Sequence, residues 1–102
     1  MTTQTETQKK AKKVRVHTLL FEYFPHALLA VAEVSEVGSK KYGEGGPTTW
    51  KDFPVATYQD AKGRHMLKDA AGDVTSDDGE GITHAAQEAW NALAVLEKLL
   101  TE

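Results

Sequence analysis

The segment Ile82–Leu100 has the sequence ITHAAQEAWNALAVLEKLL and gives the clearest indication of the fold. It contains no proline and no glycine, and its alanines and leucines recur at spacings of three and four residues, the repeat of one helix face. Small alanine side chains on such a face allow a neighbouring helix to approach closely. We therefore predict a helix here with an apolar stripe that consists of Ala85, Ala89, Ala92, Leu93, Leu96 and Leu100.

Two more helices are expected upstream of this stretch. The first runs from about His17 or Pro25 to about Lys41; since proline is tolerated only near a helix start, either the helix begins at Pro25 or a short helix precedes it. The second spans Val55 to Ala71, after a glycine-rich loop over 43–47. No alternating run of β-branched residues exceeds four positions, so strands are not expected. The predicted fold is an all-α bundle of three to four helices.

The length and composition limit the kinds of protein that this chain can be. With 102 residues it has the length of one domain. Lys and Arg total 12 against 15 Asp and Glu, and the net charge of -3 argues against a dedicated nucleic-acid binder. The absence of cysteine excludes disulfides, thiolate zinc sites and cysteine nucleophiles. No apolar run reaches the roughly 18 residues of a membrane span, and we expect a cytoplasmic protein.

Polar and apolar residues are unevenly distributed along the chain. Residues 1–13 are mostly Thr, Gln and Lys, so we expect a flexible basic tail before a single helical domain over 14–102. A domain of this size buries only about 60–65% of its unfolded surface and is often marginally stable alone. We therefore expect oligomerisation to complete the bundle.

Two helical segments carry pairs of oxygen ligands at a spacing of three residues. Glu33 and Glu36 form the first pair, and carboxylates so spaced can reach one hard cation. Glu88 and Asn91 repeat the spacing on a later helix, with an amide in place of one carboxylate. Such pairs are also common among solvated surface residues. Because both lie on largely apolar helices, acids that face the bundle centre would need a cation as partner.

Basic and aromatic residues follow in an order that suits a nucleotide. Arg64 and Lys68 lie four residues apart and could bind a polyphosphate, although they also fit an ordinary charged helix face. Lys40 precedes the glycine loop, and Trp50 follows it. Lysine could hold a phosphate there and tryptophan could stack on a base, while the end of a helix alone would also favour lysine.

Other chemistries lack their motifs or have simpler explanations. His65 and His84 are each explained as packed, hydrogen-bonded histidines, although either could orient a ligand or a water. The chain has no Gly-x-x-x-x-Gly-Lys-Ser/Thr loop, no Gly-x-Gly-x-x-Gly and no His-Glu-x-x-His.

Taken in order, these motifs resemble the MazG-like all-α nucleotide pyrophosphohydrolases, whose pattern is Glu-x-x-Glu on one helix and Glu-x-x-Asp on a later one. Glu33–Glu36 matches the first motif, and Glu88–Asn91 matches the second with Asn in place of Asp. Fifty-one residues separate Glu36 from Glu88, more than the family spacing, so Asp69, Asp73 or Asn91 could complete the ligand set. A closer resemblance, over about 18–100, is to small phage dATP/dGTP diphosphohydrolases, including the MazZ-type enzymes. It rests on Gly38–Gly43, Trp50, Arg64–His65, the acidic, glycine-containing connection over Gly72–Gly81, and His84–Asn91.

The resemblance implies hydrolysis of a nucleoside triphosphate at the α–β bond, which gives the monophosphate and pyrophosphate. Purine nucleotides of a phage nucleotide pool are expected, with dGTP first and GTP or dATP next. The resemblance implies Mg²⁺ or Mn²⁺ as cofactor and a homodimer or homotetramer in the host cytoplasm, with no membrane or nucleic-acid partner. It assigns catalysis and metal binding to Glu33, Glu36 and Glu88, with Asn91 as a further ligand; phosphate binding to Lys40, Arg64 and Lys68; and base binding to Trp50 and Asn91.

Two other functions remain open at this stage. The first is a non-enzymatic, all-α dimeric binding module that uses the basic N-terminal tail. The second is a different nucleotide hydrolase, which would release phosphate or triphosphate and would be distinguished by its products.

Overall fold

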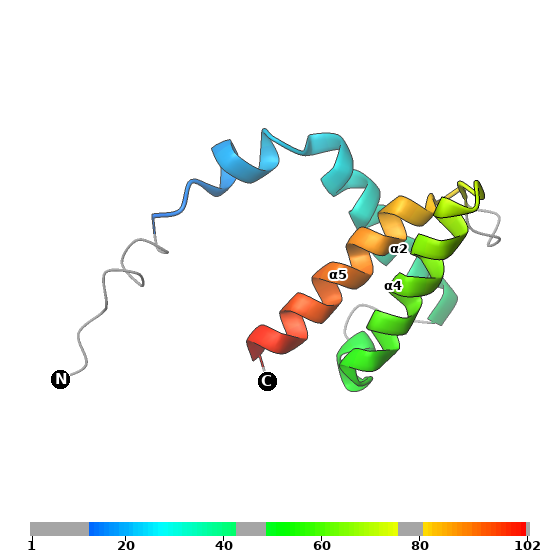
Figure 1. The fold of residues 1–102 in the computed structure, drawn as a ribbon. Coiled ribbons are helices and arrows are strands. Elements are labelled where there is room, and N and C mark those ends of the chain that lie inside the picture. Colours follow the sequence, from blue (N-terminus) through cyan, green and yellow to red (C-terminus); the bar gives the residue numbers. More distant parts are fainter. Residues whose placement is uncertain (1–12, 43–48, 76–80, 102) are drawn as a thin grey trace.

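The computed structural model describes residues 13–42, 49–75 and 81–101, and helices dominate these ranges (Figure 1). Residues 1–12 of the predicted tail over 1–13, and the glycine loop over 43–47, lie outside the described residues. The elements in chain order are the π-helical turn η1 (His17–Phe21), α2 (Pro25–Tyr42), the 3-10 turn η2 (Trp50–Asp52), α4 (Val55–Ala70) and α5 (His84–Thr101). The predicted all-α fold is therefore confirmed, and both options at the start of the first helix hold, because α2 begins at Pro25 and a short helix precedes it.

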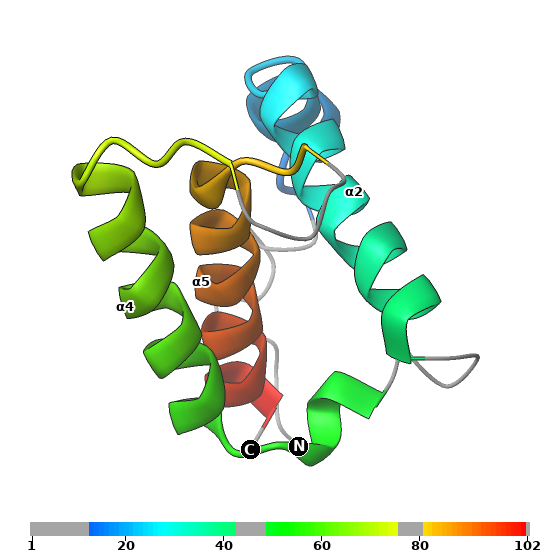
Figure 2. The same cartoon turned by 90° about the vertical axis from the view of Figure 1, so that its right-hand side faces the viewer.

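The helices α4 and α5 form an antiparallel pair, and α5 lies between α4 and α2 (Figure 2). At the end of α4 the chain turns through Gly72, whose φ of +93° is one that L side chains rarely adopt. The amide of Gly72 donates to the carbonyl of Asp69, and that of Asp73 donates to the carbonyl of Lys68, both at 3.0 Å. These two bonds are those of a Schellman motif, which satisfies the last carbonyls of the helix.

The returning segment is fixed to the start of α5 by further hydrogen bonds. The amide of His84 donates to the carbonyl of Val74 at 2.9 Å, and Thr75 and Thr83 form an isolated antiparallel bridge. The hydroxyl of Thr83 accepts a hydrogen bond from the amide of Ala86 at 3.1 Å. A threonine oxygen at this place satisfies one of the free amides at a helix start.

Three aromatic rings join η2, α4 and α5. Trp50, Tyr58 and Trp90 pack edge to face, with ring centroids 5.7 to 5.8 Å apart in each pair. The hydroxyl of Tyr58 donates to the carbonyl oxygen of Trp50, and the indole nitrogen of Trp90 donates to the hydroxyl of Ser35 on α2 at 2.8 Å. The rings therefore hold the connection after α2, and α2 itself, against the helical pair.

The buried face of α5 differs from the one that the sequence predicts. The residues of α5 that are buried are His84, Ala86, Asn91 and Ala94, whereas every member of the predicted apolar stripe is exposed. The difference has a geometric reason. His84 contacts α4 and Trp90 contacts α2, and on a helical wheel the predicted stripe lies on the opposite side of α5 from these two residues. In the single chain the leucines of α5 therefore contribute little to the core.

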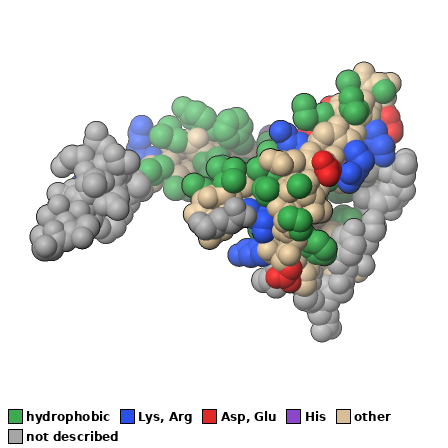
Figure 3. Space-filling model, turned by 60° about the horizontal axis from the view of Figure 1, so that its bottom comes forward, with side chains coloured by type: hydrophobic (Ala, Val, Ile, Leu, Met, Phe, Trp, Pro, Cys, Tyr) green, Lys and Arg blue, Asp and Glu red, His purple; other side chains and the backbone are tan. Residues whose placement is uncertain are grey.

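The N-terminal elements also carry uncovered apolar side chains. η1 and the start of α2 lead away from the helical pair (Figure 1), and hydrophobic side chains gather over this arm (Figure 3). None of the described helices is long and apolar enough to cross a membrane. The exposed apolar residues of the arm include Leu19, Leu20, Phe21, Tyr23, Phe24 and Leu29.

Candidate functional site

The two predicted metal ligands of α2 lie on its outer side. Glu33 and Glu36 are both exposed, whereas Ser35 contacts Trp90 of α5. At 100° per residue, Glu33 lies about 160° and Glu36 about 100° around the helix axis from Ser35. In the single chain these carboxylates do not face the bundle centre. Their spacing still allows both to reach one cation that approaches α2 from outside.

The second predicted pair is on α5 and is less accessible. Glu88 is half-buried, and Asn91 is buried with its amide nitrogen donating to the carbonyl of Gln87 at 2.7 Å. Over the ranges 13–42, 49–75 and 81–101, no group of three or more His, Asp or Glu side chains is placed to hold a metal ion. The structure therefore does not gather the four predicted ligands into one centre within a single chain.

The predicted phosphate-binding residues are all exposed. Arg64 and Lys68 lie one turn apart on α4, and Lys40 lies near the end of α2. Within the part of the chain that the structure describes, none of the three forms an ion pair. Their charges are consequently available to an anion.

Trp50 is part of the aromatic cluster of the core. Its ring is half-buried and packs edge to face against the rings of Tyr58 and Trp90. The ammonium nitrogen of Lys51 lies 5.8 Å from the centroid of the Trp50 ring, and that of Lys98 donates to the carbonyl of Lys51 at 2.8 Å. The predicted stacking of this ring on a base stays a prediction, and the structure gives the ring a packing role.

A pair of histidines occupies the interface between α4 and α5. The Nδ1 atoms of His65 and His84 are 2.7 Å apart, and His84 is only 1% exposed. An oxygen of the Asp73 carboxylate lies 3.5 Å from Nε2 of His84. The prediction that both histidines are packed and hydrogen-bonded is confirmed. The contact between the two histidines was not predicted from the sequence. The glycines that follow α4 were a signal for it, because a turn there brings the end of α4 near the start of α5.

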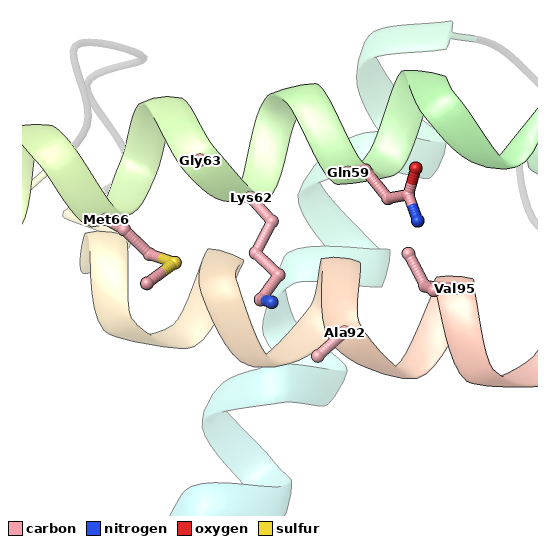
Figure 4. A pocket seen from close by; sticks show the side chains of 6 residues that line it. All are labelled: Gln59, Lys62, Gly63, Met66, Ala92 and Val95. Atoms are coloured by element: carbon pink, nitrogen blue, oxygen red, sulfur yellow. The ribbon is translucent and has the colours of Figure 1, made fainter.

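A shallow groove runs along the contact of α4 and α5, with a volume of about 230 Å³. In Figure 4 Lys62 and Gln59 extend from α4 toward α5, and Met66 lies at one end. The lining is therefore mixed, with one cation and one amide among apolar groups. The lining residues are Gln59, Lys62, Gly63, Met66, Ala92 and Val95.

Comparison with known families covers nearly the whole chain. The model of the family described as dATP/dGTP diphosphohydrolase, N-terminal, matches residues 3–102. The chain belongs to this family. No curated protein and no solved structure gives a significant match. The resemblance to dATP/dGTP diphosphohydrolases that the motifs indicated is thus confirmed.

Proposed function

We propose that this chain hydrolyses a purine deoxynucleoside triphosphate, dGTP first among them, to the monophosphate and pyrophosphate with Mg²⁺ or Mn²⁺. We further propose that it acts on the nucleotide pool of a phage-infected cell, in the cytoplasm. The observation that carries the proposal is the family match over residues 3–102. The order of acidic, basic and aromatic motifs agrees with it.

The exposed cations of α4 support the binding of a triphosphate. Arg64 offers a planar group with several N–H donors, and Lys68 adds a point charge one turn away. Neither is engaged by a carboxylate among the described residues. Because a triphosphate carries several negative charges, two neighbouring cations would stabilise it and the pyrophosphate that leaves.

The two carboxylates of α2 are the kind and number of protein ligands that the proposed cation prefers. Mg²⁺ prefers oxygen ligands, keeps several waters and often takes only one or two carboxylates beside substrate phosphates. Glu33 and Glu36, exposed and three residues apart, meet this requirement. When bound, the ion would neutralise phosphate charge and activate a water. In our proposal Glu88 and Asn91 complete the site from α5.

The exposed apolar surface supports assembly into a homodimer or homotetramer. Leu93, Leu96 and Leu100 of α5 are 50 to 73% exposed, and the arm adds further apolar side chains. Burial of each such side chain is worth up to about 1.5–3 kcal/mol. We propose that a second copy covers the α5 stripe, and that the outward-facing acids of α2 reach their remaining ligands across the interface.

An assay of substrates and products tests the proposal. The protein is incubated with each ribo- and deoxyribonucleoside triphosphate and Mg²⁺ or Mn²⁺, and the products are separated. We expect monophosphate and pyrophosphate from purine nucleotides, with dGTP turned over fastest and all turnover abolished by a chelator. Release of phosphate or triphosphate would indicate a different hydrolase. No turnover of any nucleotide would favour the non-enzymatic binding module that uses the basic tail over 1–13.

A further inference from the structure

Two apolar surfaces of the chain lie apart from each other in the structure. The first is the segment Leu19–Phe24 of the arm, in which every residue except Glu22 is apolar or aromatic. The five apolar and aromatic side chains are 38 to 63% exposed. The arm contacts the start of α2 and leads away from α4 and α5 (Figure 1), so a single chain leaves this segment uncovered.

The second surface joins the groove between α4 and α5 to part of the α5 stripe. Ala92 belongs to both, because it lines the groove and is a member of the stripe. Leu96 and Leu99 lie within about 40° of Ala92 around the axis of α5, so they continue the apolar lining. They are 51% and 58% exposed, and Met66 at one end of the groove is 48% exposed. One apolar surface therefore extends over both helices.

Each of the two surfaces carries a charge that the other one complements. Lys62 is half-buried, extends from α4 toward α5 (Figure 4) and has no ion pair among the described residues. Glu22 is the one charged residue of Leu19–Phe24, and its carboxylate lies 3.6 Å from Nε2 of His17, which is exposed. Charged groups that become buried are normally paired. A carboxylate flanked by apolar side chains is thus what this groove lacks.

The exposed area of the arm segment is sufficient for a stable contact between two copies. Full burial of an aromatic side chain removes roughly 150–250 Å² from water, and at least half of each ring of Phe21, Tyr23 and Phe24 is available. If two copies cover each other's segments, these rings and the surface beneath them account for roughly 1,200 Å², the lower limit of stable interfaces. The leucines of the segment add to this area.

We propose that the segment Leu19–Phe24 of one copy binds in the groove between α4 and α5 of a second copy, where Glu22 pairs with Lys62. The exchange is reciprocal, because both copies carry the same segment and the same groove, and a two-fold axis then closes the dimer. The inference rests on the homo-oligomer proposed above and names the segment that covers the α5 surface. It does not depend on the hydrolysis of a nucleotide.

Reversal of the two charges tests the exchange, with sedimentation velocity as the readout and circular dichroism as the check on folding. Glu22→Lys and Lys62→Glu should each weaken self-association about tenfold, because like charges then meet in both grooves. An equimolar mixture of the two variants should associate within about threefold of the unmodified chain, because each groove again receives the opposite charge. Asp60→Lys is the control, since Asp60 is exposed on α4 outside the groove lining, and it should associate normally.

The outcomes separate the exchange of arms from assembly as such. If the unmodified chain self-associates and the mixture stays as dissociated as each variant alone, or neither variant dissociates, the copies meet at another surface and the exchange is wrong. An unmodified chain that stays monomeric would overturn the assembly and the exchange together. Binding of that monomer to vesicles of anionic lipid would show that a membrane, and not a second copy, covers the arm.

A second measurement uses the unmodified chain and so does not depend on the folding of a variant. Carbodiimide joins a carboxylate to an amine that it contacts, and mass spectrometry of mixed ¹⁴N and ¹⁵N chains shows whether the joined peptides come from two copies. We expect Glu22 joined to Lys62 in peptides of mixed label. Joined peptides of one label only would place this contact within one chain, and covalent dimers joined only elsewhere would place the interface at another surface. Either result would overturn the proposal.

Discussion

At the scale of single residues, Tyr58 shows how a few side chains hold this small core together. It is buried on α4, its ring contacts both tryptophans of the aromatic cluster, and its hydroxyl donates to the carbonyl of Trp50. Burial raises the pKa of Tyr58 above its ordinary value of 10.0, and the nearby charge of Asp52 raises this pKa further. The folded state therefore favours the neutral phenol.

This pKa shift predicts how stability depends on alkaline pH. Above about pH 10 the unfolded chain loses the phenolic proton before the folded chain does, so the free energy of unfolding should fall as pH rises through that range. Tyr58→Phe should remove this part of the pH dependence and cost about 1 kcal/mol at neutral pH for the lost hydrogen bond. Urea unfolding at several pH values measures both effects. An unchanged pH profile in Tyr58→Phe would contradict the assignment.

A second prediction for a single residue concerns Glu36, a metal ligand in the proposed reaction. Glu36→Gln keeps the size of the side chain and removes its charge, so it should lower turnover of dGTP by about a hundredfold at saturating Mg²⁺. Glu97→Gln is the control, because Glu97 is an exposed acid on α5 outside the proposed site. Full activity of Glu36→Gln would remove this residue from the metal site.

At the scale of elements, the helices follow from local sequence and the contacts between them do not. The expected span of Val55 to Ala71 agrees with α4, which ends at Ala70, and proline marked the start of α2. The apolar stripe of α5 was predicted, but not that a single chain leaves it exposed, because periodicity identifies an apolar face without showing what covers it. The contact of His65 with His84 depends on how α4 and α5 pack against each other, which no spacing rule supplies.

Substitution by alanine should have opposite effects on stability at Gly72, which follows the end of α4, and at Gly63, in the middle of this helix. Gly72→Ala places a side chain at a φ of +93° and should destabilise the fold by about 1–2 kcal/mol. Gly63→Ala should stabilise it by about 0.5–1 kcal/mol, because the helix gains propensity and an added Cβ meets no atom within 4 Å. Urea unfolding of both variants measures the difference. Equal effects would contradict the role of the Schellman turn.

At the scale of the whole molecule, large apolar side chains of α5 and of the N-terminal arm are left uncovered in a single chain. The leucines of α5 and the aromatic residues of the arm are exposed, while the buried apolar residues within 13–40, 49–75 and 81–101 are Tyr58, Ile82, Ala86 and Ala94. A monomer with such a surface tends to associate. The separation of the predicted metal ligands within one chain has the same explanation in our account, since a second copy would supply what one chain lacks.

A charge on the α5 stripe should therefore disrupt assembly and activity together. Leu96 is 51% exposed, and Leu96→Glu should convert the proposed dimer or tetramer to monomer in sedimentation velocity, with loss of dGTP turnover. Thr57→Glu adds the same charge at an exposed position of α4 and should leave assembly unchanged. An unmodified chain that sediments as a monomer and is active would contradict the proposed assembly.

³¹P NMR of dGTP with the protein and Mg²⁺ tests whether this chain cleaves dGTP between the α and β phosphates, as we propose. We expect the triphosphate signals to disappear while those of dGMP and pyrophosphate grow in equal amounts. Inorganic phosphate with dGDP, triphosphate with deoxyguanosine, or unchanged dGTP would contradict it.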